Sequence, residues 1–593
     1  MEIKRLFDFL TEQNNLRPSQ PFLCAKVVTS KGKEWVSYTM AEVQEKANQV
    51  SQLLLDLGLT KGDKIALIAA NRPEWNFVDI GALQIGVHTV PMYPTISQSD
   101  YEFIFNNAGI KYAFIGDAVI YDKVLPLKEK ISSLIDIYSF DKLPGAKNFE
   151  ESLPKQFNAN EIQKRKDTID ENDLATIIYT SGTTGNPKGV MLSHKNIASN
   201  IISSMQAVPF RRGTKALSFL PLCHTFERMV FYAYLYMYIH IHYAESIDAI
   251  GDNLKEVRPY CFTTVPRLLE KVYEKIMEKG NALTGFKKNL FFWSIKLGNQ
   301  YKLGEDQGLW YNLQLNIARK LVFSKWHEAL GGEINFIVTG SAPMQPRLIT
   351  LFSAAGIPVI EGYGLTETSP VLSVNGMDEK DRMCGTVGIP IPGVQIKIAD
   401  DGEILAKGPN VMMGYYKSPE LTAEVMDSEG WFHTGDIGEW VNNKFLKITD
   451  RKKELFKTSG GKYIAPQVIE NKMKESRFIE QIMVVGASEK FVSALIVPSF
   501  LHLRSWIKIN GIEDGTNQEI VSHDKVKELI QKEVDRLNIN FGKWEQIKKF
   551  TLIAQEWTTE TGELTPTMKV KRKILMDKYK AQVEAMYANG NGH

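Results

Sequence analysis

The stretch that decides the fold is Tyr179-Thr180-Ser181-Gly182-Thr183-Thr184-Gly185-Asn186-Pro187-Lys188-Gly189-Val190. The apolar run at 175–179 leads into it and predicts a short buried strand. Glycines let the loop after the strand turn tightly, and its backbone N–H groups, its hydroxyls and Lys188 suit phosphate oxygens. An ordinary surface loop would rarely gather so many such residues directly after a buried strand. The stretch therefore predicts a phosphate-binding loop.

This loop is not a Walker P-loop. The Walker motif requires a Gly-Lys pair followed by Ser or Thr. Here the lysine lies between Pro187 and Gly189, so the helix start that cradles phosphate in the Walker motif is not built in the same way. A P-loop NTPase or kinase is excluded on this ground.

The composition predicts a globular protein of at least two domains, because 593 residues exceed what one hydrophobic core usually supports. With 71 basic and 69 acidic residues, the net charge of +2 gives no indication of a nucleic-acid partner. The 4 cysteines are scattered without a CxxC pair, which fits a reducing cytosol. Residues 1–8 contain no apolar core of a signal peptide. The most apolar segment, 229–243, is shorter than the roughly 20 residues that span a bilayer, so we expect a cytoplasmic protein, with peripheral membrane contact left open.

The predicted secondary structure changes along the chain. Strand and helix signals alternate up to about residue 400, which predicts layered α/β structure. Short strands with turns follow at 394–449 and predict a β-rich subdomain. The charged run at 450–454 precedes Ser459-Gly460-Gly461 and reads as a hinge or, equally well, as a solvated turn. The remaining residues predict a small α+β domain.

Two further glycine-rich clusters, at 339–343 and 361–368, follow apolar runs. Each lies at the carboxyl end of a predicted strand, where open α/β sheets place their ligands, and neither matches a dinucleotide fingerprint. Glu367 and Thr366 offer hard oxygen atoms for a magnesium–phosphate complex, and Tyr363 offers a ring for a flat base. Taken singly, each of these residues is more often structural.

The last candidates lie toward the end of the chain. Asp436 and Arg451 suit hydrogen bonds to ribose hydroxyls. The segment 566–572 concentrates cations, and on those residues alone we favour a solvated basic patch.

The order and spacing of these segments resemble the adenylate-forming superfamily of acyl-CoA synthetases, luciferases and peptide-synthetase adenylation domains across nearly the whole chain. The matching segments are 179–190, 220–228, 340–343, 361–368, 431–436, 450–462 and 566–572. The long-chain fatty acyl-CoA synthetases in particular are matched by Leu220-Pro221-Leu222-Cys223-His224-Thr225-Phe226-Glu227-Arg228, by Thr264-Val265-Pro266-Arg267-Leu268 and by Leu564-Thr565-Pro566-Thr567-Met568-Lys569. The superfamily usually has a glycine where this chain has Met568, which leaves open whether the role of Lys569 is altered, because Lys571 lies close by.

The resemblance implies a fold and a reaction. The fold is a large N-terminal domain of layered α/β subdomains with a β-rich subdomain (1–450), a hinge (451–453) and a small mobile α+β C-terminal domain (454–593). The reaction couples a long-chain fatty carboxylate to coenzyme A through an acyl-adenylate made from ATP, with Mg²⁺ as cofactor. AMP and pyrophosphate leave.

The resemblance also implies a role for each matching residue. The residues expected to hold the β- and γ-phosphates are Thr180, Ser181, Gly182, Thr183, Thr184 and Lys188. Those expected around adenine are Tyr363 and its neighbour Gly362, with Gly340, Ser341 and Ala342 on the other side. Those expected on the remaining groups are Glu367 on Mg²⁺, Thr366 on the α-phosphate, and Asp436 and Arg451 on the ribose. Lys569 would bridge the carboxylate and the α-phosphate, Lys453 would be the hinge, Gly460 and Gly461 would line the pantetheine channel, and His224 would lie where the acyl and pantetheine tunnels meet.

Several alternatives stay open at this point. A medium-chain or aryl acid–CoA ligase and a fatty acyl-AMP ligase share the same motifs, and a non-catalytic acyl- or nucleotide-binding protein is the remote alternative. The aromatic segment 229–243 could line an acyl tunnel or form a core helix and strand. Chain-length preference, acyl saturation, the end of the tunnel and the choice between monomer and homodimer are not decided by the sequence.

Overall fold

The computed structural model describes residues 3–30, 32–180, 187–208, 210–558, 561–565 and 569–588. The predicted phosphate-loop residues Ser181, Gly182, Thr183 and Thr184 lie outside the described residues, as does Met568. The chain divides into a large unit, made of residues 1–397, 405–433 and 440–446, and a small unit, made of 398–404, 434–439 and 447–593.

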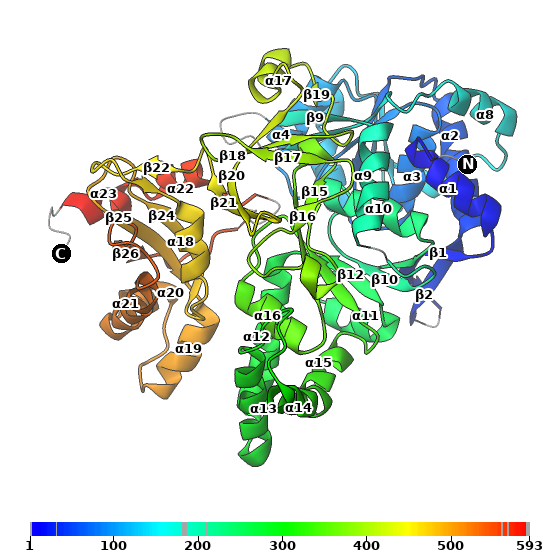
Figure 1. The fold of residues 1–593 in the computed structure, drawn as a ribbon. Coiled ribbons are helices and arrows are strands. Elements are labelled where there is room, and N and C mark those ends of the chain that lie inside the picture. Colours follow the sequence, from blue (N-terminus) through cyan, green and yellow to red (C-terminus); the bar gives the residue numbers. More distant parts are fainter. Residues whose placement is uncertain are drawn as a thin grey trace. The chain divides into compact units, whose positions relative to one another are not determined.

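The large unit contains two mostly parallel sheets covered by helices (Figure 1). The strands of the first sheet, in spatial order, are β19 (Gly414–Tyr415), β9 (Lys188–Ser193), β8 (Leu174–Thr180), β4 (His88–Pro91), β3 (Lys64–Ile68), β5 (Tyr112–Ile115), β6 (Asp136–Ser139) and β7 (Lys147–Asn148). Those of the second are β16 (Ile389–Pro390), β15 (Val371–Val374), β14 (Val359–Gly364), β13 (Phe336–Thr339), β12 (Cys261–Thr264), β10 (Lys215–Ser218), β11 (His240–Tyr243), β1 (Pro21–Thr29) and β2 (Gly32–Thr39). The central strands are continuous apolar runs because helices bury both of their faces.

Helices cover the sheets of the large unit and connect many of their strands. They are α1 (Leu6–Leu16), α2 (Met40–Asp56), α3 (Pro73–Leu83), α4 (Gln98–Ala108), α5 (Ala118–Val124), α6 (Leu127–Lys130), α7 (Phe149–Ser152), α8 (Ala159–Asp167), α9 (His194–Ala207), α10 (Thr225–Tyr236), α11 (Ile250–Val257), α12 (Pro266–Ala282), α13 (Gly285–Gly298), α14 (Leu309–Ala318), α15 (Ser324–Ala329), α16 (Pro346–Ala354) and α17 (Pro419–Val425). A π-helical turn, Arg319–Phe323, joins α14 to α15, and short 3₁₀ turns lie at Thr366–Thr368 and Glu379–Asp381.

The start of α2 shows how local sequence sets an element. Thr39 and Glu42 form the capping box that their spacing predicts: the Thr39 N–H donates to Glu42 Oε2 at 2.7 Å, and the Glu42 N–H donates to Thr39 Oγ1 at 3.3 Å. Two N–H groups that have no partner inside the helix are satisfied in this way.

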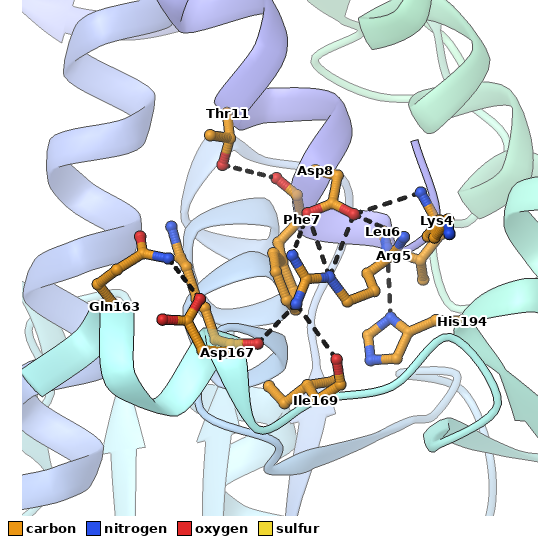
Figure 2. Close-up of polar contacts among 11 residues, drawn as sticks. Lys4, Arg5, Leu6, Phe7, Asp8, Thr11, Gln163, Asp167, Ile169 and His194 are labelled. Carbon is orange, nitrogen blue, oxygen red and sulfur yellow. Dashed lines mark hydrogen bonds and ion pairs between the residues drawn. The ribbon is translucent and has the colours of Figure 1, made fainter. Parts of the chain in front are cut away.

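Helix α1 is fixed to the large unit through its first turn (Figure 2). The Arg5 guanidinium pairs with Asp8 at 2.9 Å and also donates to the backbone carbonyls of Lys166 and Ile169. The Leu6 N–H donates to Nδ1 of His194, a side chain that is fully buried and whose pKa burial lowers to about 3. A neutral imidazole that accepts a backbone N–H therefore anchors the N-terminal helix.

The segment 229–243 forms most of α10 together with β11. Tyr232, Tyr234 and Tyr243 are each buried to 2% exposure or less and belong to the main hydrophobic core. The structure therefore assigns these aromatic side chains to packing, which is the core reading of the two that the sequence allowed.

The segment after residue 394 folds as short strands, as the sequence predicts. A four-stranded sheet has the order β17 (Gln395–Ile398), β18 (Glu403–Lys407), β20 (Phe432–Val441) and β21 (Phe445–Arg451). The small unit adds a two-stranded sheet, β22 (Phe456–Lys457) and β23 (Tyr463–Ile464), and a three-stranded sheet, β24 (Ile479–Val485), β25 (Val492–Pro498) and β26 (Ile547–Leu552). Its helices are α18 (Pro466–Met473), α19 (Phe500–Ile509), α20 (Asn517–Ser522), α21 (Asp524–Asn538), α22 (Arg572–Lys578) and α23 (Lys580–Ala588).

Each unit has its own hydrophobic core. In the small unit, Val526, Ile530 and Val534 recur at helical spacing on α21 and are buried in one hydrophobic core with residues of β24 and β25. The predicted fold class is confirmed: a large N-terminal part of α/β layers with a β-rich segment, and a small α+β C-terminal part.

Candidate active site

The phosphate-loop stretch forms a β-hairpin. Strands β8 and β9 pair antiparallel, and Thr180 at the end of β8 lies opposite Lys188 at the start of β9. The Lys188 ammonium lies over the Tyr415 ring, 5.2 Å from its centroid. The hairpin thus holds Lys188 at the edge where the loop residues 181–187 connect the two strands.

Tyr415 joins Lys188 to Glu367. The Tyr415 hydroxyl donates a hydrogen bond to Glu367 Oε1 at 2.9 Å. The backbone of Glu367 is also fixed, because its carbonyl accepts from the Met412 N–H at 2.8 Å. Two residues that the sequence places 179 positions apart in one proposed site are therefore brought together through a tyrosine that sequence reasoning missed. In the sequence, Tyr415 is marked only by its place in Gly414-Tyr415-Tyr416.

The turn that carries Thr366 and Glu367 is tightly packed. A Cβ on Gly364 would lie 1.8 Å from the Pro370 carbonyl oxygen, so only glycine fits where the chain folds back. Asn200 on α9 and Asn410 donate to the backbone carbonyl of Val371, at 2.7 Å and 3.2 Å, and Asn410 also donates to that of Thr368. These amides hold the Glu367 turn against α9.

The clusters 340–343 and 361–364 lie side by side, because β13 and β14 are parallel neighbours with Thr339 opposite Glu361. A Cβ on Gly340 would lie 3.4 Å from the Gly362 carbonyl oxygen. Ser341 follows with φ of +68°, in the left-handed region, and Ala342 is exposed beyond it. Tyr363 on β14 is 9% exposed. The structure therefore brings together the residues predicted around adenine.

Glu361 is a second residue that sequence reasoning missed. Its carboxylate accepts from the Met344 N–H at 2.8 Å, and the side chain is 4% exposed. Burial raises the pKa of this carboxyl to about 8. A buried acid thus ties the 340–344 loop to β14.

His224 caps the N-terminus of α10. Its Nδ1 accepts from the Phe226 N–H at 3.2 Å, and its ring lies 6.5 Å from the Tyr93 ring. The next residues of the same motif are buried: Glu227 accepts from Ser218 and Thr263, and burial raises the pKa of its carboxyl to about 7.

Arg228 links α10 to the first sheet. Its guanidinium pairs with Asp79 of α3 at 2.5 Å and donates to the hydroxyls of Thr176 on β8 and Thr89 on β4. Both charged side chains are 1% exposed or less. The motif residues after His224 therefore fix the helix that carries it, because a buried charge left without its partner is costly.

The predicted ribose residues are paired within the small unit. Arg451 Nε lies 2.9 Å from Asp436 Oδ1, and the Asp436 side chain is 3% exposed. The Arg451 N–H also donates to Asp450, whose pKa burial raises to about 7. An oriented carboxylate beside a guanidinium offers both acceptors and donors to a diol.

Lys569 lies in one of two paired backbone segments of the small unit, 563–565 and 569–571. The backbones of Thr565 and Lys569 are hydrogen-bonded at 2.8 Å, and Leu564 pairs with Val570. The Lys569 side chain is exposed.

The basic patch that follows Lys569 is not simply solvated. Arg572 pairs with Glu454 at 3.2 Å and with the buried Glu470 at 2.5 Å, and it also donates to the Val484 carbonyl. The solvated reading of this segment is therefore wrong for Arg572. The sequence could not show it, because both acidic partners lie about a hundred residues away.

The predicted hinge and channel residues are exposed. Lys453 lies in the turn after β21, whereas its neighbour Lys452 is held by Asp401 at 2.6 Å and Glu403 at 2.8 Å. Gly460 and Gly461 form the turn between β22 and β23, where Gly461 has a φ of +77° and its N–H donates to the Thr458 carbonyl.

The donor set of the large unit fits a magnesium–nucleotide complex. Glu367 is half-buried and accepts from the Tyr415 hydroxyl, Thr366 precedes it in the same turn, and the Lys188 ammonium lies over the ring of the same tyrosine. Mg²⁺ requires hard oxygen donors, such as those of Glu367 and Thr366. Phosphate oxygens are stabilised by a nearby cation, such as Lys188. This arrangement can position and neutralise phosphates.

Two family signatures match the chain. The AMP-binding enzyme family matches residues 10–416, and the AMP-binding enzyme C-terminal domain family matches residues 454–591. Among curated proteins, the long-chain-fatty-acid–CoA ligase FadD15 of Mycobacterium bovis is 32% identical over 93% of this chain and 92% of its own length. Human long-chain-fatty-acid–CoA ligase 1 is 34% identical over 96% of this chain and 83% of its own length.

Solved structures share the fold at lower identity. The adenylation domain of a carboxylate reductase from Mycobacterium chelonae aligns with a TM-score of 0.75 and 21% identity, covering 99% of this chain and 91% of that one. A fatty acyl CoA synthetase of Mycobacterium tuberculosis aligns with a TM-score of 0.61 and 20% identity, covering 98% of this chain and 99% of that one. The family signatures, the curated relatives and the fold agree, and the chain belongs to the AMP-binding enzyme family of adenylate-forming ligases.

Proposed function

We propose that this protein is a long-chain fatty acid–CoA ligase that works in two half-reactions. In the first, an oxygen of the fatty carboxylate attacks the α-phosphate of ATP, and pyrophosphate leaves. In the second, the thiol of coenzyme A attacks the acyl carbonyl of the adenylate, and AMP leaves. The observation that carries the proposal is the Lys188–Tyr415–Glu367 cluster, in a chain whose curated relatives are named as long-chain ligases.

The large unit would supply the nucleotide side of the first half-reaction. Lys188 and Thr180, with the loop between them, would hold the β- and γ-phosphates. Glu367 would hold Mg²⁺, which when bound supplies neutralisation of phosphate charge. Thr366 would contact the α-phosphate, and Tyr363 would stack on adenine beside Gly340. Displacement at phosphorus requires positioning and charge neutralisation more than covalent help from the protein.

The small unit would supply the remaining contacts. Asp436 and Arg451 would hold the ribose, and Lys569 would bridge the carboxylate and the α-phosphate. For the second half-reaction, Gly460 and Gly461 would line the pantetheine channel, and His224 of the large unit would lie where acyl chain and pantetheine meet. We propose residues 451–453 as the hinge between the two half-reactions.

Three other functions share these motifs. A medium-chain or aryl acid–CoA ligase would make the same adenylate from a shorter or flat acid. A fatty acyl-AMP ligase would stop at the adenylate. A non-catalytic acyl- or nucleotide-binding protein would lack Glu367 or Lys569, and both are present.

Pyrophosphate release across free acids of increasing chain length tests the proposal. Each methylene buried in an apolar tunnel contributes about 0.8 kcal/mol, so kcat/KM is expected to rise about fourfold per carbon until the tunnel ends. Thioester formation in the presence of coenzyme A distinguishes the ligase from an acyl-AMP ligase. Release with benzoate or a medium-chain acid but not with a palmitate-like acid would favour the shorter-acid alternatives, and no acid-dependent release would end the proposal.

A further inference from the structure

Three side chains that bind metals well lie together in the large unit, away from the residues assigned above. Cys24 on β1 and His240 and His242 on β11 place one ligand atom each within 4.8 Å of the others. The two imidazole rings lie 4.2 Å apart between centroids.

The sheet explains why these three residues meet. Strands β1 and β11 are parallel neighbours, and Cys24 lies opposite His242. His240 precedes His242 by two positions, so the alternation along a strand puts its side chain on the same face. Ser37 on β2 lies opposite Cys24 and belongs to the same row. The register of three strands therefore builds one cluster.

The position of the cluster separates it from the proposed reaction. His240 is the first residue of β11, at the amino end of the parallel strands. The candidate residues His224 and Gly340 follow the carboxyl ends of β10 and β13. A group bound at the cluster would therefore lie at the opposite end of the sheet from the adenylation loops.

The environment orients the ligands as metal sites do. His242 Nδ1 lies 3.4 Å from the backbone carbonyl oxygen of His240, which fits a ring that donates from Nδ1 and keeps the lone pair on Nε2. Cys24 is 1% exposed, whereas Ser37 is exposed and lies 3.1 Å from His240 Nε2, so the cluster has a polar opening.

Charged groups around the cluster have both signs. Lys215 on β10 lies opposite His240, and Lys26 on β1 is held by Glu245 and Glu256. Burial raises the pKa of the Cys24 thiol, an effect that the Lys215 cation only partly offsets, and the same cation disfavours a high metal charge. These conditions suit a metal ion that binds thiolate strongly.

We propose that Cys24, His240 and His242 form a three-ligand site for a thiophilic transition-metal ion, Zn²⁺ or Cu⁺. The fourth position faces Ser37 and is open to water. Binding releases the Cys24 thiol proton to solvent and forms a metal–thiolate bond. The ion would tie β1 to β11 and so fasten the N-terminal hairpin to the second sheet.

Metal retention and thermal unfolding of the full-length protein test the site. Chelator-treated protein is given Zn²⁺, Cu⁺ or Mg²⁺, desalted and assayed for bound metal, and Tm is measured in each state. The wild type is expected to retain one thiophilic ion per chain and to unfold at a higher Tm, because only the folded state holds the ligands together. With Co²⁺ as a probe, a thiolate charge-transfer band is expected.

Cys24→Ser and His242→Gln are expected to lose metal retention, the Tm shift and the Co²⁺ band, whereas Cys384→Ser, at a cysteine outside the cluster, keeps all three. Lys215→Met distinguishes the two ions, because it should strengthen Zn²⁺ binding more than Cu⁺ binding. The metal-free Tm of each variant reports whether it folds. If the wild type retains neither ion, or if Cys24→Ser binds as well as the wild type, the site does not exist.

A different observation concerns the surface of α14. Leu309, Trp310 and Leu313 are 91%, 72% and 52% exposed, and Ile317 and Leu321 continue the same row. We call these five residues the α14 stripe. The opposite face of the helix is also apolar, because Leu315 and Ala318 are buried in the core. A single exposed apolar residue is ordinary, but a row at helical spacing marks a surface that contacts something apolar.

The segment that contains the α14 stripe is positively charged, which favours an anionic partner. Residues 285–330 contain seven basic side chains (287, 288, 296, 302, 319, 320 and 325) and three acidic ones (305, 306 and 328), a net charge of +4. The whole chain has a net charge of +2, so the rest of the chain is slightly negative. These residues span α13 to α15, which lie together with α12 in Figure 1. An exposed apolar row in a segment of net positive charge suits an anionic lipid surface, whereas a second copy of the same cationic segment would be repelled.

We infer that the α14 stripe inserts into the surface of an anionic bilayer as a peripheral contact. None of the described helices has the length and apolar character to cross a membrane. The inference does not depend on which acid the protein activates.

Co-sedimentation with vesicles of phosphatidylcholine, with and without phosphatidylglycerol, tests this contact. The wild type is expected to sediment with the anionic vesicles and to be released by salt, because screening weakens surface electrostatics. Trp310→Ser combined with Leu313→Ser is expected to reduce the bound fraction several-fold, and Leu501→Ser, an exposed leucine of the small unit, is expected to leave it unchanged. Equal sedimentation of the double variant, or a dimer in solution that depends on Trp310, would overturn the inference.

Discussion

At the scale of single residues, Tyr415 is the side chain on which the orientation of Glu367 depends. Tyr415→Phe removes the hydroxyl that donates to Glu367 Oε1 and keeps the ring beneath Lys188. Loss of a residue that orients a metal ligand typically costs about 10- to 100-fold in metal affinity or activity. We expect a lower rate of adenylate formation together with a higher Mg²⁺ concentration at half-maximal rate.

The control for this prediction is Tyr416→Phe, the next residue, whose ring lies near Lys64 and Lys417 instead. It should leave the Mg²⁺ dependence of pyrophosphate release unchanged. A Tyr415→Phe enzyme with normal Mg²⁺ dependence would show that the tyrosine does not position Glu367.

Glu361 gives a prediction about pH. The ordinary pKa of a glutamate carboxyl is 4.5, and burial raises that of Glu361 to about 8 in the folded state. Below pH 4.5 the proton is bound in both states. As the pH rises toward 8, the folded state keeps a proton that the unfolded chain has lost, so the free energy of unfolding falls across this window. Glu361→Gln, which stays neutral and can still accept from the Met344 N–H, should flatten the fall.

Differential scanning calorimetry measures this effect as the slope of Tm against pH. The measurements run from pH 5 to pH 8, because the pKa of Glu361 is 4.5 in the unfolded chain and about 8 in the folded protein. The exposed Glu129→Gln is the matched control. Glu227 and Asp450 have raised pKa values as well, so some slope remains in the variant. An unchanged slope in Glu361→Gln would mean that Glu361 is ionised in the folded protein.

At the scale of the element, Lys569 lies where the backbone segments 563–565 and 569–571 are hydrogen-bonded to each other. Glu563 pairs with Lys578 of α22, which lowers the pKa of that carboxyl to about 2, and Arg572 fixes the following turn to Glu454 and Glu470. Lys569→Ala removes one charge and keeps these backbone pairings. Loss of one preorganised donor typically costs about 10²- to 10³-fold in rate, so adenylation should fall by this factor while thioester formation from supplied acyl-adenylate is largely kept.

The neighbouring Lys571→Ala is the control, since this lysine is the other cation that could take the role after Met568. The two half-reactions are measured separately, by pyrophosphate release and by thioester formation. If Lys569→Ala slows both steps equally, its assignment to the first step is wrong, and if only Lys571→Ala slows adenylation, the role belongs to Lys571.

The elements also show what the sequence could and could not predict. The strands, the capping box of α2 and the α/β layering follow from local periodicity, which a single sequence contains. Tyr415, Glu361 and the Arg228–Asp79 pair depend on contacts between segments far apart in the chain, such as the 48 residues between Tyr415 and Glu367. Arg572 was misread for the same reason, because its acidic partners are distant in sequence. The sequence shows which side chains could bind phosphate, metal or ribose, but it does not show which residues those side chains contact.

At the scale of the whole molecule, the two units carry different parts of the proposed reaction. Lys188, Glu367 and Tyr363 belong to the large unit, and Asp436, Arg451 and Lys569 belong to the small one. We propose that Lys569 is needed only in the first of the two steps. The contacts that the small unit's residues make with the substrate must therefore change between the steps. The segment 451–453 is the proposed hinge, and Lys453 is one of its two exposed residues.

Lys453→Pro tests the hinge, because proline fixes φ near −65°. Lys453→Ala removes the same side chain and keeps the backbone free, so it is the matched control. We expect Lys453→Pro to carry out one half-reaction at close to the normal rate and to lose most of the other, whereas Lys453→Ala keeps both. Rates of adenylation and of thioester formation from supplied adenylate, each compared with the Tm of the variant, separate a blocked rotation from a folding defect. A Lys453→Pro enzyme with normal overall turnover would place the hinge elsewhere, and one that loses both half-reactions with a normal Tm would mean that Lys453 acts in the chemistry itself.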